Sequence, residues 1–139
     1  MAAALQTAIT TTSYAGRIQY VGWLPAEGVI SALQAADLLI CPTRSAFNEG
    51  LALVVIEAAA LGLPSVASSV VPAQELVPDA CASFPADDRL ALQAVLDRLI
   101  ADRAAYAELV AGTAPVRAKV QSRAHGWGSQ LARALLGPQ

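Results

Sequence analysis

The chain has 139 residues, of which 55% are hydrophobic and 14% are charged, and its formal net charge at pH 7 is -2. That length suffices for one compact core, and that composition excludes a disordered, solvated chain. No basic stripe is present, so we expect no nucleic-acid partner. Cys41 and Cys81 lie in apolar runs without metal-ligand spacing, which favours free buried thiols over a disulfide.

The longest apolar stretch, residues 51–71, does not predict a membrane span. It carries Glu57 and is interrupted by Gly62 and Pro64, whereas a span needs about 20 apolar residues without a charge. The first five residues lack the charged region of a signal peptide. We therefore expect a cytoplasmic protein.

The first third of the chain predicts two helices and two strands. Residues 2–13 favour a helix, and residues 17–23 alternate as a strand does. A second helix is predicted over residues 25–36, since proline suits a first turn and the acid that follows suits the helix dipole. Residues 38–41 form a short apolar run ended by Pro42, which is typical of a strand buried on both faces.

The middle of the chain continues the alternation. After a polar loop, residues 51–61 predict a helix that ends at Gly62, a residue that readily adopts the left-handed conformation of a helix C-cap. Residues 65–68 and 80–84 predict two more strands. Between them, residues 72–77 favour a short helix or a turn.

The rest of the chain is predicted to be helical. Apolar residues recur at helical spacing from Asp88 onward. Two further helical stretches, residues 104–111 and 121–136, follow, with Gly112 and Pro115 between them as the expected break.

Strands that alternate with helices indicate an α/β fold. We expect a Rossmann-like parallel sheet of about four strands with helices on both faces. In such sheets, ligands bind beyond the carboxyl ends of the strands. The loop after Cys41 follows such an end and is the place to search for a site.

Glu49 and Gly50 stand in this loop, where the sequence predicts a helix N-terminus. Unpaired amides and the helix dipole attract anions there, and glycine permits a close backbone approach. A diphosphate would fit, neutralised mainly by amides because Arg44 is the loop's cation. On the simpler interpretation, Glu49 is only a favourable charge near a helix start.

Glu57 lies within a helix that is apolar nearly all round, so the sequence predicts a buried carboxylate in need of donors. Ribose hydroxyls would supply two. The alternative interpretation is a salt bridge to Arg44 or another arginine.

The segment from Glu49 to Pro64 places seven residues between its two glutamates. It resembles the E-x7-E signature and the trailing EAxAxGxP run of retaining GT-B glycosyltransferases of the group 1, or family four, type. This large family contains sucrose- and polysaccharide-synthesising enzymes. The resemblance extends in order over about residues 17–136, through the segments 21–25, 35–43, 65–68 and 75–77 and through Trp127.

The resemblance implies the C-terminal, donor-binding domain of such an enzyme. The parent protein would be a hexosyltransferase that transfers a sugar from a nucleoside diphosphate sugar with retention, in polysaccharide or cell-envelope glycan synthesis, without a metal or other cofactor. Glu49, as the catalytic residue, would contact the donor sugar, amides would hold the diphosphate, and Glu57 would bind the ribose. The implied donor-binding residues are Arg44, Glu49, Gly50, Leu51, Ala52, Leu53 and Glu57.

Two short segments depart from the family pattern. Gly50-Leu51-Ala52 replaces the usual Gly-Phe-Gly, so the methyl group of Ala52 would crowd the donor sugar. Val71-Pro72 replaces a glycine pair. Either change is compatible with a divergent enzyme or with lost activity.

The resemblance also implies that residues 1–139 are one incomplete domain, without its first two strands and without an acceptor domain. The chain alone would then be inactive. We expect as partners the nucleotide-sugar donor and either the missing N-terminal domain or another copy of the chain, with peripheral membrane association through the missing domain. His125 is given no catalytic role.

In the family's strand order, the missing strands would lie between residues 17–21 and 38–41. We therefore expect direct pairing of those two segments, a swapped or complemented assembly, or a marginal fold, because exposed strand edges favour association. Two alternative functions are a non-catalytic nucleotide-binding or interaction module and an unrelated doubly wound domain with a chance E-x7-E pair.

Overall fold

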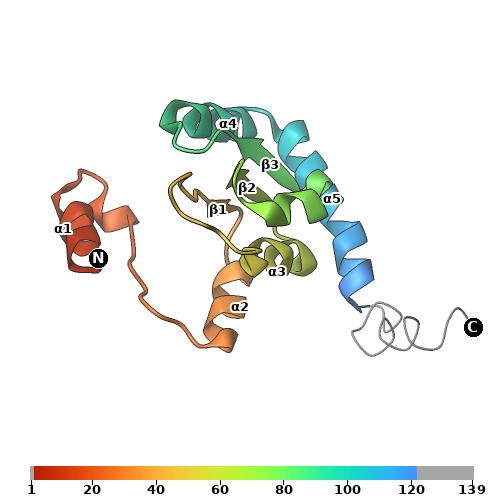
Figure 1. Ribbon diagram of the computed structural model, residues 1–139, viewed down its shortest axis with the longest axis horizontal. Coiled ribbons are helices and arrows are strands. Elements are labelled where there is room, and N and C mark those ends of the chain that lie inside the picture. The colour runs from red at the N-terminus through yellow and green to blue at the C-terminus, as the bar shows by residue number, and fades with distance from the viewer. Residues whose placement is uncertain (1, 122–139) are drawn as a thin grey trace, which may run out of the picture. The chain divides into compact units, whose positions relative to one another are not determined.

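The structure is a computed structural model, and it describes residues 2–121 (Figure 1). The chain divides into two compact units, one up to Ala32 and one from Leu33 onward. The first unit contains helix α1 (Ala2–Thr11), the 3-10 helix η1 (Ala15–Arg17) and most of helix α2 (Ala26–Gln34). The predictions of helices at residues 2–13 and 25–36 are confirmed.

The strand predicted at residues 17–23 is wrong. Only Arg17 of this stretch belongs to η1, the rest is irregular backbone, and the side chains of Ile18, Tyr20 and Val21 are exposed. A strand requires a neighbouring strand to accept and donate its backbone hydrogen bonds. No described segment supplies one here, so alternation alone did not produce a strand.

The second unit is built on a parallel three-stranded sheet in the order β1-β2-β3. Its strands are β1 (Leu39–Cys41), β2 (Ser65–Ser68) and β3 (Cys81–Phe84). The predicted α/β class is confirmed, with three strands rather than about four. Direct pairing of residues 17–21 with β1 is wrong, while the swapped or complemented assembly and the marginal fold stay predictions.

Helices cover both faces of this sheet (Figure 1). Helix α3 (Leu53–Leu61) and the 3-10 helix η2 (Pro72–Leu76) pack on the face of Ala67, and helix α4 (Arg89–Ala101) packs on the face of Val66. All four residues of β2 are buried. The central strand therefore lies in an aliphatic core on both sides.

The predicted helix ends in this unit follow from local chemistry. Gly62 adopts φ 88° at the C-cap of α3 and donates its N–H to the carbonyls of Ala58 and Ala59. The Asp88 carboxylate accepts the N–H of Ala91 at 2.9 Å and begins α4. The predicted start of α3 at residue 51 is two residues too early.

The two cysteines are free, as predicted. Cys81 is buried and Cys41 is half-buried. Burial raises the pKa of the Cys81 thiol above its ordinary value. The thiol is therefore neutral at physiological pH and serves as a small apolar group in the core.

Helix α5 (Arg103–Gln121) runs without interruption through Gly112 and Pro115, so the predicted break there is wrong. Pro115 removes one helical N–H, but Pro115 and its potential acceptor Ala111 are both exposed, and water can satisfy the freed carbonyl. The helix predicted over residues 121–136 lies outside the described residues, apart from Gln121.

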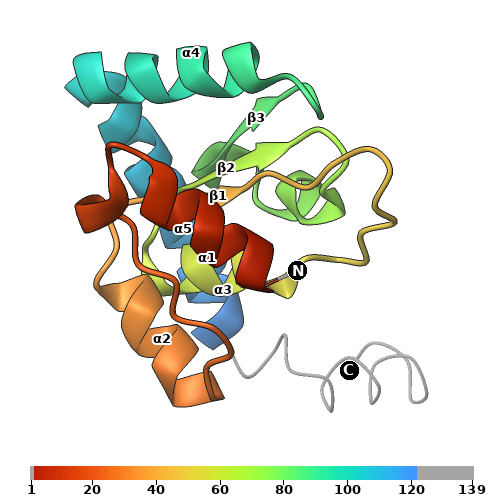
Figure 2. The ribbon, with the colours of Figure 1, turned by 90° about the vertical axis from the view of Figure 1, so that its left-hand side faces the viewer.

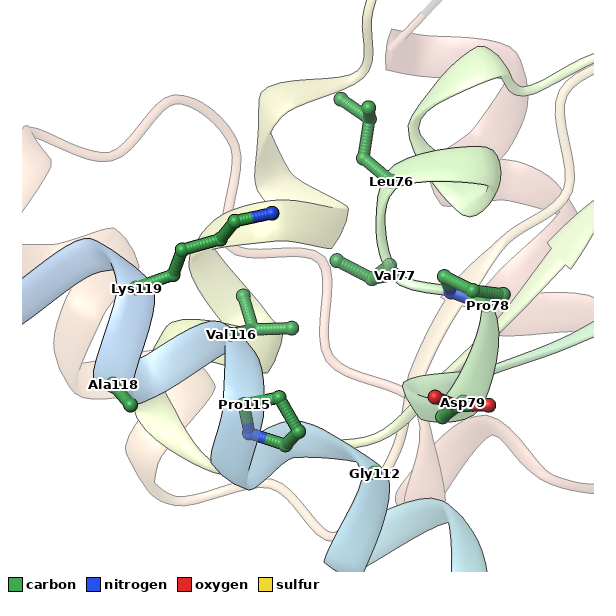
Figure 3. A pocket seen from close by; sticks show the side chains of 9 residues that line it. All are labelled: Leu76, Val77, Pro78, Asp79, Gly112, Pro115, Val116, Ala118 and Lys119. Atoms are coloured by element: carbon green, nitrogen blue, oxygen red, sulfur yellow. The ribbon is translucent and has the colours of Figure 1, made fainter. Parts of the chain in front are cut away.

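Gly112 permits a close crossing between α5 and the 3-10 helix η3 (Pro78–Ala80). A Cβ atom at this position would lie 1.9 Å from the backbone oxygen of Asp79. Figure 3 shows Gly112 and Asp79 on the two elements that form this crossing. The glycine is thus a packing residue rather than a helix breaker.

We predict that Gly112→Ala lowers the free energy of unfolding by about 1–3 kcal/mol, because the methyl group must displace backbone atoms. Helix propensity alone predicts the opposite sign, a gain of about 1 kcal/mol. Urea denaturation of the variant decides between them. Ala114→Gly, at an exposed position of the same helix, calibrates the propensity effect.

Candidate functional site

The carboxyl ends of all three strands contribute to one rim of the sheet. The β1–α3 loop (residues 42–52) leaves β1 at this rim, as Figure 2 shows. Ser68, the last residue of the central strand, donates its hydroxyl proton to the carbonyl of Thr43 at 2.7 Å. This bond holds the start of the loop against the end of β2.

Glu49 is held within this loop by Thr43. The Thr43 hydroxyl donates to Oε2 of Glu49 at 2.8 Å, and both side chains are half-buried. Oε1 of Glu49 makes no hydrogen bond to the described residues. The carboxylate is therefore oriented and keeps one oxygen available as an acceptor.

Backbone donors follow directly after Glu49. Within the described part of the chain, the amides of residues 50–54 have no hydrogen-bond acceptor, as expected at a helix N-terminus. Val55 is the next residue whose amide is bonded, to the carbonyl of Ala52 at 3.0 Å. The loop thus presents an oriented carboxylate beside a run of free N–H groups.

Ala52 has a left-handed backbone, with φ 53° and ψ 60°, at the N-cap of α3. A side chain at such angles crowds the following carbonyl, so glycine is the residue that adopts them without cost. The Gly-Phe-Gly run that the resemblance predicts here would place a glycine at these angles. The cost lies in the backbone conformation, in addition to any crowding of a ligand.

Arg44 does not pair with Glu57, contrary to the salt bridge considered from sequence. Its Nε donates to Oδ1 of Asp87 at 3.3 Å, while the side chain stays 82% exposed. The other two guanidinium nitrogens make no hydrogen bond to residues 2–121. An exposed ion pair of this kind contributes little to stability, so Arg44 stays available to an anion.

Glu57 is exposed, so the prediction of a buried carboxylate is wrong. Helix α3 packs through Val55, Ala58 and Ala59, whereas Leu53, one turn before Glu57, is 60% exposed. The sequence is apolar around the whole helix, but the described residues cover only part of it. Glu57 has no hydrogen-bond or ion-pair partner among them.

Asp87 is a site residue that the sequence analysis missed. It lies in the turn after β3, has φ 64°, and accepts hydrogen bonds from both the amide and the hydroxyl of Ser45. The Ser45 hydroxyl, the Ser45 amide and Arg44 together hold the pKa of Asp87 below its ordinary value of 3.8. The sequence feature that could have indicated Asp87 is its position shortly after a predicted strand.

The described residues of the second unit form several cavities, among them three of about 260, 350 and 520 Å³. The cavity of about 260 Å³ is lined at the strand ends by Pro42, Arg44, Phe84 and Asp87, among others, and Arg44 is the one predicted donor-binding residue in its lining. A larger one of about 520 Å³ lies between α5 and the η2–η3 segment (Figure 3). The larger cavity contains none of the predicted donor-binding residues, so the candidate site is at the strand ends.

Comparison with known proteins identifies the family. The model of the family described as Glycosyl transferases group 1 matches residues 1–102. The chain belongs to this family. It is also 32% identical, over 125 residues, to the amylovoran biosynthesis glycosyltransferase AmsK of Erwinia amylovora. That match covers 86% of this chain and 30% of AmsK, so the chain spans about a third of its relative's length.

Residues 2–121 contain neither a metal-binding cluster nor a membrane-spanning helix. No group of three or more His, Cys, Asp or Glu side chains within residues 2–121 is arranged to hold a metal ion. None of the helices in that range combines the length and the apolar character needed to cross a bilayer. His125 lies outside this range.

We predict that Ala52→Gly raises the free energy of unfolding by about 0.5–1 kcal/mol. Relief of the left-handed strain, worth about 1–2 kcal/mol, exceeds the loss of one half-buried methyl group, at most about 0.8 kcal/mol.

The reverse change at Gly62 is the matched control for this prediction. Gly62→Ala adds a Cβ at φ 88° with no neighbouring atom within 4 Å, so only the backbone cost applies and the variant should be less stable. Equal denaturation midpoints for Ala52→Gly and the parent would contradict the assigned conformation.

Proposed function

We propose that this chain is the donor-binding part of a retaining glycosyltransferase that uses a nucleoside diphosphate sugar. The observation that carries the proposal is the set of unpaired amides at residues 50–54, directly after the oriented carboxylate of Glu49. Membership of the group 1 family supports it. The relative's role in amylovoran biosynthesis supports a transfer in polysaccharide or cell-envelope glycan synthesis, and we propose that the transferred sugar is a hexose.

We assign the diphosphate to the groups of the site that carry positive charge or donate hydrogen bonds. The N-terminal amides of α3 bind the diphosphate, where the helix dipole stabilises the negative charge that develops on the leaving group. The free nitrogens of Arg44 add a positive charge. Because these groups supply the stabilisation, we propose that transfer requires no divalent metal.

The two glutamates would contact different parts of the donor. Oε1 of Glu49 is free to accept a hydroxyl of the transferred sugar, since Thr43 occupies Oε2. Glu57, in the second turn of α3, is exposed and can bind the ribose hydroxyls without an initial burial cost. Acceptor binding would lie in the rest of a longer cytoplasmic protein.

We predict that substitutions of the two glutamates have different effects on the affinities for a nucleoside diphosphate and for its sugar conjugate, both measured by calorimetry. UDP, GDP and ADP are titrated first to find the base that binds. Glu57→Gln should weaken both ligands by about 10- to 100-fold, through loss of charge-assisted bonds worth about 1.5–3 kcal/mol. Glu49→Gln should weaken only the sugar conjugate.

Glu108→Gln is the matched control, because Glu108 is an exposed carboxylate on α5. If Glu49→Gln and Glu57→Gln bind like this control, the assignment of both glutamates fails. Sugar transfer is measured in the full-length enzyme. Normal turnover with both glutamates replaced would instead favour a non-catalytic role for this site.

A further inference from the structure

Asp87 has a backbone conformation that its residue type does not favour. Its φ is 64°, in the left-handed region where glycine is at ease and a side chain usually is not, although aspartate tolerates it better than most. Such conformations persist where surrounding contacts hold them and are frequent at functional sites. The contacts of the Asp87 carboxylate therefore explain why this backbone conformation is kept.

Those contacts all come from the β1–α3 loop. Oδ2 of Asp87 accepts the amide of Ser45 at 3.2 Å and also the Ser45 hydroxyl, while Oδ1 accepts Nε of Arg44. The partners are 42 and 43 residues away in sequence. One side chain at the end of β3 thus joins the turn after β3 to the loop after β1, past the end of the central strand.

Short backbone bonds connect this junction to Glu49. The amide of Phe47 donates to the carbonyl of Arg44 at 2.9 Å, and the amide of Glu49 donates to the carbonyl of Phe47 at 3.0 Å. Each bond spans only two or three residues, so the segment is locally folded. A displacement of Arg44 and Ser45 would therefore also displace Phe47 and Glu49, because these bonds join Arg44 to Phe47 and Phe47 to Glu49.

We infer that Asp87 is a positioning residue, which clamps the β1–α3 loop to the turn after β3 and thereby sets the places of Glu49 and of the free amides that follow it. The clamp itself follows from the contacts of residues 44, 45 and 87. Its consequence for donor binding rests on the proposed function. Asp87 touches no donor atom in this scheme and acts through Ser45 and Arg44.

The test is Asp87→Gly, because glycine adopts φ 64° without strain while the carboxylate is removed. We expect Asp87→Gly to unfold at the same temperature as the parent or at a higher one. That result would exclude general destabilisation as the cause of a more mobile loop. Limited proteolysis with chymotrypsin reports on the loop through Phe47, which is 62% exposed. Cleavage after Trp23, which is 87% exposed and lies in the first unit, is the internal reference.

We predict that Asp87→Gly raises the rate of cleavage after Phe47 at least about tenfold relative to cleavage after Trp23, since proteolysis follows local opening. Asp87→Asn keeps an acceptor oxygen for Ser45 and should restore most of the protection. Asp97→Asn, which removes an exposed carboxylate in the middle of α4, should behave like the parent. An unchanged rate of cleavage after Phe47 in Asp87→Gly would overturn the clamp, whatever the nucleotide affinity of that variant.

Donor binding is measured on the same variants by titration with UDP, GDP and ADP. A nucleoside diphosphate affinity lowered about fivefold or more in Asp87→Gly and recovered in Asp87→Asn supports the positioning role. Faster cleavage with an unchanged affinity would overturn that role while leaving the clamp. If the parent binds none of the three nucleotides, the proposed function fails, and the proteolysis still decides the clamp.

Discussion

The central strand β2 is buried along its whole length, with α3 packed on one face of the sheet and α4 on the other. A strand in this position needs a neighbour on each side, and β1 and β3 supply them in parallel. Parallel strands end at the same edge, so the loops after all three strands meet there. The Ser68 bond to the Thr43 carbonyl is the most direct sign of that meeting.

The chemistry at this edge combines hydrogen-bond donors and acceptors with the charged side chains of Arg44, Glu49 and Asp87. Glu49 is oriented by Thr43, the amides of residues 50–54 are unpaired, and Arg44 is only partly occupied by Asp87. An anion placed before α3 would meet amides, a dipole and a cation together. This combination suits the nucleoside diphosphate sugar that we propose as the donor, because the charge of a departing diphosphate has to be stabilised.

Three positions show that backbone geometry and packing determine what each small residue does. Gly112 is needed because η3 crosses α5 closely, whereas Gly62 is needed for its left-handed backbone. Ala52 has a left-handed backbone without the freedom of glycine, at a position where the resemblance to the family predicts glycine. The strain at Ala52 lies within the loop that carries the candidate site.

Local chemistry in the sequence was enough to determine most of the elements. The helices, the strands at residues 38–41, 65–68 and 80–84, and the loop that contains Glu49 follow from hydrophobic period and capping residues, because these depend on near neighbours. Three features depended on contacts between distant residues: the absence of a strand at residues 17–23, the continuity of α5 and the exposure of Glu57. The pairing of Asp87 with Ser45 also depended on the tertiary structure. The two residues are 42 positions apart, and the sequence around Asp87 does not indicate which distant residue its carboxylate will contact.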